Sequence, residues 1–311
     1  MERADSNMDA YSSLPVEKWW GDENLYLWQG FWFRLQYLQA TQEVHNHFDA
    51  VPSDVILASF PKTGTTWLKA LLYSIINRSS RDSLITNNPH ELVPSLEVQI
   101  YRRDIASAHS PARSPSGGIF NTHIPYQLLP ETIKTGECRV VYITRNPKDT
   151  FVSLWHFVGN STKPWPLEMA LERFCSGVVP YGSYFDHVLG YWKESLERPK
   201  KVFFISYEEL KEDPKTHVKR LAEFLGCPFS GEDEEEKEVE EIVRSCSFER
   251  LSNLEVNKSS DRPTWLPLPY SSYFRQGGMG DHKNYLDPEM IKRIDTITHE
   301  KLHGSGLVFG I

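Results

Sequence analysis

Cysteine is scarce in this sequence, and its few residues are scattered. Only 4 cysteines occur among 311 residues, and none of them shows Cys-x-x-Cys spacing: Cys138, Cys175, Cys227 and Cys246. In a chain of this length such cysteines indicate free thiols in a reducing compartment rather than a disulfide framework or a zinc site. No cluster of His, Cys and Asp has the spacing of metal ligands, so we expect no metal.

Long apolar runs are also missing. The best stretch covers residues 67–76 and is interrupted by Lys69, whereas a membrane helix needs about 20 apolar residues. The first residues do not combine a basic start with an apolar stretch, so we expect no secretory signal and a cytoplasmic protein. We also expect residues 1–20 to form a disordered tail before a single domain over 21–311.

Positive charge is in deficit. The 34 Lys and Arg residues are outnumbered by 42 Asp and Glu, which gives a net charge of −8. General nucleic-acid binding depends on Lys and Arg against phosphates, so this balance argues against it. With 40% hydrophobic and 24% charged residues the chain has the composition of a globular domain.

Three segments pair a short apolar run with a following helix pattern. The runs predicted as strands are 54–60, 139–144 and 201–206, and the helices after them are 68–76, 148–157 and 218–225. Strands that alternate with helices predict an α/β fold, with a central, mostly parallel sheet flanked by helices on both sides.

The other segments carry weaker patterns. Apolar residues recur at helical spacing between 28 and 48, which predicts one helix there, and a last helix is predicted over 288–302. Residues 79–118 predict long loops around one or two short helices, and residues 252–274 predict a long loop. The acidic run 232–241 indicates a solvated helix start or loop.

The turn after the first predicted strand has the chemistry of an anion site. Unpaired backbone amides and the helix dipole favour negative charge at a helix N-terminus. Gly64 permits close approach of a phosphate, Lys62 adds a positive charge, and Thr65 and Thr66 add hydroxyl groups. The plainer interpretation is an ordinary capped helix, but a Lys and a Gly within a Thr-rich turn favour a P-loop-like phosphate cradle. In the Walker pattern Lys follows the second Gly, whereas here it precedes the Gly, which argues against an ordinary P-loop ATPase or kinase.

Four blocks in order resemble the soluble, cytosolic sulfotransferases, most of all their plant branch. The blocks are 60–67 (Phe-Pro-Lys-Thr-Gly-Thr-Thr-Trp), 120–125 (Phe-Asn-Thr-His-Ile-Pro), 142–149 with Ser153, and 275–284. The similarity extends from about residue 28 to 300. It implies transfer of a sulfuryl group from 3′-phosphoadenylyl sulfate (PAPS) to a hydroxyl group, with adenosine 3′,5′-bisphosphate as product and no metal.

The resemblance also assigns site residues. It places the 5′-phosphosulfate on Lys62, Thr63, Gly64, Thr65 and Thr66, the 3′-phosphate on Arg145, Ser153, Arg275, Gln276 and Gly277, and the adenine among Trp67, Tyr207, Ser247 and Phe248. Arg suits a phosphate because its guanidinium can bind two oxygens at once.

Two residues are assigned to catalysis. His123 would be the general base that takes the acceptor proton, since an imidazole with a pKa near ~6.5 suits that task. Lys62 would stand by the bridging oxygen, where negative charge grows as the nucleotide leaves.

The chain departs from the family pattern at three site positions. Asn121 stands where many animal relatives have Lys, Gln276 replaces a common Lys, and His282 replaces a usual Trp. The animal dimer motif starts at Lys283 but is not completed, so the sequence predicts no dimer of that type and leaves the oligomeric state open.

The acceptor is left as a small hydroxylated compound, aromatic or polycyclic. Six aromatic residues of the variable segments suggest a ring-lined pocket: Trp155, Phe157, Trp165, Trp265, Tyr270 and Tyr273. Two alternatives to a sulfotransferase stay open, a nucleotide-binding phosphoryl-transfer enzyme and a protein that binds PAPS without turnover.

Overall fold

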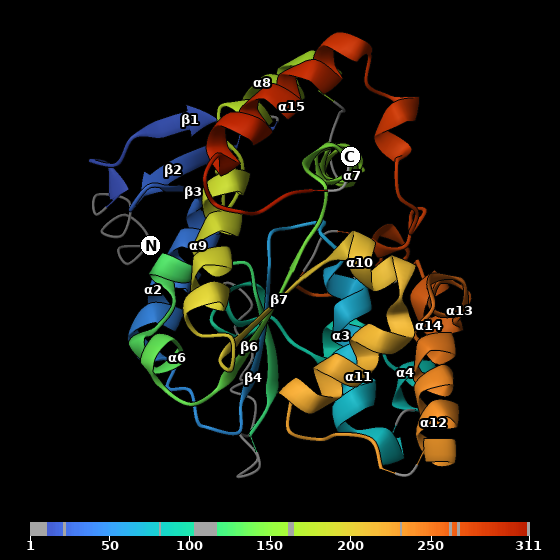
Figure 1. The fold of residues 1–311 in the computed structure, drawn as a ribbon. Helices are drawn as coiled ribbons and strands as arrows, with labels where there is room; N and C mark the ends of the chain where they lie inside the picture. The colour runs from blue at the N-terminus through green and yellow to red at the C-terminus, as the bar shows by residue number, and fades with distance from the viewer. Residues whose placement is uncertain are drawn as a thin grey trace.

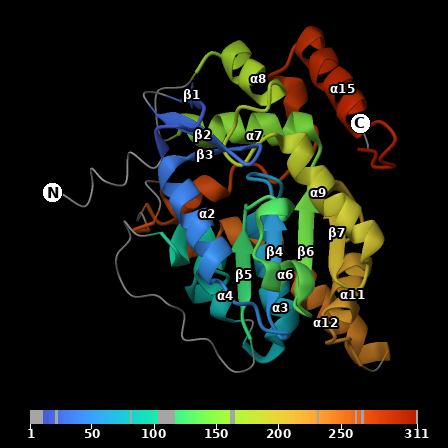
Figure 2. The same cartoon turned by 90° about the vertical axis from the view of Figure 1, so that its left-hand side faces the viewer.

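A four-stranded parallel sheet with the order β5-β4-β6-β7 forms the centre of the molecule (Figures 1 and 2). Its strands are β4 (Val55–Ser59), β5 (Ile119–Thr122), β6 (Arg139–Thr144) and β7 (Val202–Ser206). The computed structural model describes residues 11–20, 23–80, 82–102, 117–160, 165–230, 232–260, 263–265 and 268–309.

Both faces of this sheet are buried. Ile56 and Ala58 of β4 point into one hydrophobic core, whereas Val55 and Leu57 point into a second core on the opposite face. A strand covered on both sides reads as a continuous apolar run rather than an alternating one, which is why the sequence pattern identified it.

Helices cover the two faces, as Figure 1 shows. The first core is closed by α2 (Leu35–His47), α6 (Glu131–Thr135) and α9 (Tyr184–Glu197), and the second by α3 (Thr65–Ile76), α10 (Tyr207–Glu212), α11 (Pro214–Phe224), α12 (Glu232–Ser245) and α13 (Phe248–Ser252). This arrangement confirms the predicted α/β fold with a parallel sheet flanked by helices. The acidic run lies in α12.

A further layer lies above the carboxyl ends of the strands (Figure 2). It is made of α7 (Pro147–Gly159), α8 (Leu167–Cys175) and α15 (Pro288–Leu302), which pack against one another. The remaining elements are short: η2 (Arg78–Ser80), α4 (Ser83–Thr86), α5 (Pro89–Leu92), the π-helical turn η3 (Leu96–Ile100), η4 (Tyr126–Leu128), α14 (Glu255–Lys258), η5 (Tyr270–Tyr273) and η6 (Asp281–Asn284).

The single helix predicted between 28 and 48 is wrong at its start. β2 (Asn24–Trp28) and β3 (Phe31–Arg34) form an antiparallel hairpin there, with β1 (Val16–Lys18) beside β2. Gln29 and Gly30 both have positive φ, 48° and 86°, which is the geometry of a tight hairpin turn. Only 35–47 is helical.

The prediction of a disordered tail over 1–20 is wrong for residues 11–20. Val16–Lys18 pair with β2, and Trp19 and Trp20 are each only 2% exposed. Two buried indoles anchor this segment to the first core, where Trp20 stacks on Trp165 with ring centroids 5.1 Å apart. Residues 1–10 lie outside the described residues.

The loop predicted over 252–274 also needs correction, because it contains the helical turns α14 and η5. The prediction over 79–118 underestimated the helical turns, and residues 103–116 of that segment lie outside the description. Within the described residues, no helix has the length and apolar character needed to cross a membrane.

Candidate active site

The four parallel strands end at one edge of the sheet, and a predicted site residue follows each of them. The loop with Lys62 follows β4, His123 follows β5, Arg145 follows β6 and Tyr207 follows β7. Side chains that follow parallel strands meet at one edge, which is where ligands bind in open α/β sheets.

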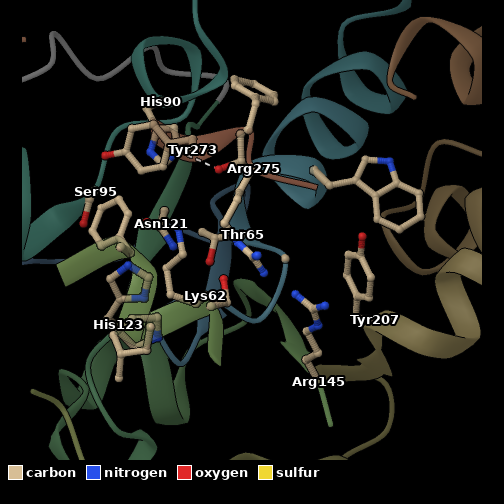
Figure 3. A pocket seen from close by; sticks show the side chains of 18 of the residues that line it. Lys62, Thr65, His90, Ser95, Asn121, His123, Arg145, Tyr207, Tyr273 and Arg275 are labelled. Atoms are coloured by element: carbon tan, nitrogen blue, oxygen red, sulfur yellow. Dashed lines mark hydrogen bonds between the residues drawn. The ribbon is translucent and has the colours of Figure 1, made fainter. Parts of the chain in front are cut away.

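This edge borders a cavity of about 250 Å³ (Figure 3). The predicted site residues that line it are Lys62, Gly64, Thr65, Thr66, Trp67, His123, Arg145, Ser153, Tyr207, Phe248, Arg275, Gln276 and Gly277. Segments more than 200 residues apart in the sequence therefore meet around one space.

Two predicted residues are not among the lining residues. Thr63 is fully buried, and its hydroxyl donates to the carbonyl oxygens of Phe60 (2.8 Å) and Ile143 (2.9 Å). The Ser247 side chain accepts the amide of Arg250 and caps α13. Both side chains form hydrogen bonds within the protein, and neither residue lines the cavity.

The loop before α3 has the backbone of an anion cradle. Gly64 is the N-cap of α3 with φ of 113°, and Lys62 also has a positive φ of 74°. A Cβ at Gly64 would lie 2.7 Å from Cδ2 of Tyr207 and 2.9 Å from Cδ1 of Ile143, so no other residue fits without displacing them. The unpaired amides of the first turn of α3 are thereby turned to the cavity edge.

Lys62 is half-buried, and the charges of two arginines act on it. Its Nζ lies 3.9 Å from the ring centroid of Phe157. Burial lowers the pKa of Lys62 to about 7, with further lowering by the positive charges of Arg275 and Arg145. Three positive side chains around one cavity repel one another, and an anion placed among them would relieve that repulsion.

Arg145 contacts the covering segment, residues 275–282, of which residues 275–278 line the cavity. Its Nη2 donates to the carbonyl oxygen of Gly278 (2.7 Å) and lies 3.3 Å from Oδ2 of Asp149, whereas its Nε is buried without a hydrogen-bond partner. A buried, unpaired guanidinium donor is costly unless a ligand atom completes it. The geometry therefore offers one donor of Arg145 to an anion.

The covering segment 275–282 is held down by its own contacts. The Tyr207 hydroxyl donates to the carbonyl oxygen of Gly277 (2.8 Å), and a Cβ at Gly277 would lie 2.4 Å from the Phe248 ring. Arg275 forms an ion pair with Asp281 (2.5 Å). The Gln276 side chain, with its amide nitrogen turned towards Asp281, donates to Oδ1 of Asp281 (2.8 Å).

The departure at His282 has a structural explanation. The Asp149 carboxylate accepts from the amide of Gly280 (2.7 Å), the amide of His282 (3.0 Å) and Nδ1 of His282 (2.8 Å). The imidazole thus joins the covering segment to α7. Asn121, the second departure, is only 1% exposed, and its Nδ2 donates to the carbonyl oxygen of Leu57 (3.1 Å).

His123 is fixed at both its ring and its backbone. Nδ1 lies 2.7 Å from the carbonyl oxygen of Ser59, which can only accept, so Nδ1 carries the proton and Nε2 has the free lone pair. The His123 amide donates to Oε1 of Glu97 (2.9 Å), and its carbonyl oxygen accepts from Nε2 of His187 (2.9 Å). Burial lowers the pKa of His123 to about 4, so the imidazole is neutral at pH 7. The ordinary value assumed from the sequence does not hold in this site.

Sequence reasoning missed part of the lining. Arg34, Tyr37, His90, Ser95, Gln99 and Tyr181 also border the cavity. Of the six aromatic residues proposed for an acceptor pocket, only Phe157, Trp265 and Tyr273 line it. The one signal at a missed position is structural: Tyr181 has a φ of 64°, a strained conformation that clusters at functional sites.

Within the described part of the chain, no group of three or more His, Cys, Asp or Glu side chains could hold a metal ion. The donors around the cavity are mostly hydroxyl, amide and cationic groups, and they suit an oxyanion rather than a cation.

Known proteins whose sequences are similar to this chain include several sulfotransferases. The chain is 44% identical to cytosolic sulfotransferase 15 of Arabidopsis thaliana, over 96% of this chain and 85% of that one. It is 44% identical to flavonol 4′-sulfotransferase of Flaveria chlorifolia, over 93% of this chain and 91% of that one.

Two solved structures share the fold. A crystal structure of an Arabidopsis thaliana sulphotransferase matches with a TM-score of 0.77 and 38% identity, covering 99% of this chain and 97% of the other. A mouse sulfotransferase complexed with PAP, adenosine 3′,5′-bisphosphate, matches with a TM-score of 0.69 and 30% identity, covering 90% and 95%. The family model for the sulfotransferase domain matches residues 52–306, and the chain therefore belongs to the sulfotransferase family.

Proposed function

We propose that this protein transfers the sulfuryl group of PAPS to a hydroxyl group of a small aromatic or polycyclic metabolite, with His123 as general base. The observation that carries the proposal is the orientation of His123: its Nδ1 is committed to the carbonyl oxygen of Ser59, and its ring lines the same cavity as Lys62. A neutral imidazole nitrogen and a half-buried lysine that line one cavity can serve as a general base and as a cation that stabilises the leaving group.

The reaction follows from these positions. The acceptor oxygen attacks sulfur, its O–H bond breaks, and the proton passes to Nε2 of His123. The bond from sulfur to the bridging oxygen breaks, and its electron pair stays on the 5′-phosphate. Lys62 stabilises the charge that grows there, because a fixed cation in a buried site acts more strongly than one in water.

Besides burial, the positive charges of Lys69 and Lys62 lower the pKa of His123. An anionic co-substrate supplies negative charge nearby, which stabilises the imidazolium and raises its pKa towards the value that suits a base. Binding of the nucleotide thus prepares the base for the acceptor.

The remaining groups are proposed to hold the nucleotide. Arg145, Arg275 and Ser153 would bind the 3′-phosphate and the Gly64 loop the 5′-phosphosulfate, with the amide of Thr63 in place of its committed hydroxyl. Trp67 and Tyr207, whose rings meet edge to face at 5.4 Å, would border the adenine together with Phe248. The PAP complex of the mouse relative supports binding of this nucleotide.

The acceptor and the location are proposed from the relatives. Flavonol is named in one relative, and the apolar side chains around the cavity, Tyr37, Val98, Phe157 and Tyr273 among them, suit a flat hydroxylated ring system. Several relatives are named cytosolic, which supports a cytoplasmic enzyme.

Incubation with PAPS labelled in sulfur, together with a panel of phenols and alcohols, tests the proposal. We expect labelled acceptor with the intact protein and almost none with His123→Ala, while both bind adenosine 3′,5′-bisphosphate. Binding without labelled product over the whole panel would favour the non-catalytic alternative. Transfer from γ-labelled ATP would favour a phosphoryl-transfer enzyme.

A further inference from the structure

A cluster of ionisable side chains lies directly beneath the phosphate loop, and the reaction above does not use it. It consists of Lys69 on α3, His90 on α5 and Glu97 on η3. Lys69 and Glu97 are 0% exposed and His90 is 7% exposed. Buried ionisable groups are costly, so a cluster that brings three of them together calls for an explanation in function.

The hydrogen bonds of this cluster have a defined direction. Nζ of Lys69 lies 2.8 Å from the carbonyl oxygen of Val93 and 3.1 Å from Nδ1 of His90. An ammonium group has three donors and no acceptor, so Nδ1 of His90 must accept. The proton of the neutral imidazole is then on Nε2.

Nε2 of His90 lies 2.9 Å from Oγ1 of Thr66. Because Nε2 carries the proton, the Thr66 oxygen accepts this bond, and the hydrogen of the Thr66 hydroxyl has to be given to a different acceptor. Thr66 lies in the first turn of α3 and lines the cavity. The acceptor that this position offers is an anion in the loop.

Two features keep the cluster in this state. The His90 ring stacks on Tyr273, with centroids 4.0 Å apart and planes at 24°, which limits its rotation. The negative charge of Glu97 favours the ammonium form of Lys69 and opposes burial, which lowers the pKa of Lys69 to about 7. Glu97 also accepts from the Thr122 hydroxyl and the His123 amide, both at 2.9 Å, so its position is fixed.

We propose that Lys69, acting through His90, orients the Thr66 hydroxyl as a donor to the phosphosulfate, so that Lys69 and His90 are positioning residues of the nucleotide site. If the Lys69 charge is removed, His90 can carry its proton on Nδ1 and accept from Thr66, and the hydroxyl then turns away from the anion. The inference rests on the proposed function, because it takes the anion in the loop to be the 5′-phosphosulfate.

A double-mutant cycle tests whether Lys69 acts on the bound anion through the Thr66 hydroxyl. Lys69→Met removes the charge and Thr66→Val removes the hydroxyl, and calorimetry measures the affinity for adenosine 3′,5′-bisphosphate. We expect each single variant to lose roughly tenfold, since a hydrogen bond to a charged group contributes about 1.5–3 kcal/mol. The double variant should lose no more than Thr66→Val alone. Losses that multiply, or a Lys69→Met variant that binds like the parent, would overturn the proposal.

Two controls separate positioning from a general loss of structure. Adenosine 3′-monophosphate lacks the 5′-phosphate, so its affinity should be the same in the parent and in Lys69→Met; an equal loss for both ligands would contradict the inference. A second pair avoids the buried lysine: His90→Gln keeps an N–H donor near Thr66 and should stay within about threefold of the parent, whereas His90→Leu should lose roughly tenfold. Equal losses in that pair would also refute it.

The outcome is distinguishable from failure of the proposed function. A parent protein that does not bind the bisphosphate refutes the function itself. If the parent binds the bisphosphate tightly and the losses of affinity in the Lys69 and Thr66 variants multiply, only the proposed positioning by Lys69 and His90 is refuted.

Discussion

At the residue scale, burial shifts the protonation equilibria of the site towards the uncharged forms. Lys62 and His123 face the same cavity, and desolvation lowers both pKa values, to about 7 and about 4. Sequence alone indicated which residue types were present. Their protonation depends on side chains from distant segments, such as Arg275 beside Lys62.

The first prediction concerns Lys62 and pH. An anion in the loop favours the charged amine, so binding raises the pKa of Lys62 from about 7 and takes up a proton above that pH. The affinity for adenosine 3′,5′-bisphosphate should therefore fall as pH rises from 7.5 to 9, by up to about tenfold per pH unit for each such group. Phosphates are already ionised in that range, since their second pKa is about 6.

Calorimetry in buffers of different ionisation enthalpy measures this proton uptake. Lys69, whose pKa is also lowered to about 7, should add to it in the same direction. The matched control is Lys62→Arg, because a guanidinium stays charged throughout and removes the contribution of this position. Unchanged proton uptake in that variant would show that Lys62 is not the titrating group.

The second prediction concerns His123. His123→Ala should lower turnover by ~10²–10⁴-fold, the usual contribution of a positioned base, with little change in bisphosphate affinity. The deficit should shrink for acidic phenols, which are partly ionised and need the base less. The exposed His299 on α15 offers a control, and His299→Ala should behave like the parent.

Steady-state rates with a series of phenols of decreasing pKa decide the matter. If the deficit is the same for every acceptor and bisphosphate binding is weakened as well, His123 only supports the structure beneath the loop.

At the scale of elements, the third prediction concerns the turn between β4 and α3. Gly64→Ala places a methyl group 2.7 Å from the Tyr207 ring and 2.9 Å from Ile143, on a backbone with φ of 113°. A left-handed conformation alone costs a residue with a side chain roughly 1–2 kcal/mol. The collision adds to this cost, so the variant should lose stability and most of its bisphosphate affinity.

Urea unfolding compares this variant with Gly304→Ala. Gly304 also has a positive φ, 73°, but a Cβ there would meet nothing within 4 Å. The control should therefore lose only the free energy that a left-handed backbone conformation costs a residue with a side chain. Equal losses in the two variants would mean that contact with Tyr207 and Ile143 does not matter.

The units that the sequence predicted are those whose signal is local. β6 and α15 were predicted with the ends that the structure has, because their apolar runs are bounded by charged residues or Pro. β5 was missed because it has only four residues. β3 and the turn before it were mistaken for the start of a helix because their aromatic residues repeat at spacings that also fit a helix.

The residues of the candidate site also divide into those with a local sequence signal and those without one. Residues next to strand ends carried short motifs and could be predicted from them. Arg34, Ser95 and Tyr181 could not, because they reach the cavity only through tertiary packing of the hairpin, η3 and the segment before α9.

At the scale of the whole molecule, the fourth prediction concerns acid. Burial lowers the pKa of His123 to about 4, that of His187 to about 3 and that of His90 well below its usual value. The unfolded chain protonates these imidazoles near pH ~6.5, whereas the folded protein does not. The free energy of unfolding should therefore fall as pH decreases from about 6.5 to 4, by up to ~1.4 kcal/mol per pH unit for each group.

Glu97 acts in the opposite direction, because burial raises its pKa and the folded state then holds a proton that the unfolded state releases. The net slope should still have the sign set by the three histidines. Urea unfolding at pH 7, 6 and 5 measures it, and His187→Gln should reduce the slope by one group. Stability that is constant or higher at pH 5 would contradict the prediction.

The contacts that hold segment 275–282 in place also affect the rate of product release. Asp149 accepts hydrogen bonds from the amides of Gly280 and His282, and Arg145 donates to the carbonyl oxygen of Gly278. In the proposed binding mode, these contacts have to break before the product nucleotide can leave, and product release is a common slow step in enzymes with covering loops. We expect rapid mixing with excess substrate to give a burst of product equal to the amount of enzyme, followed by a slower steady phase.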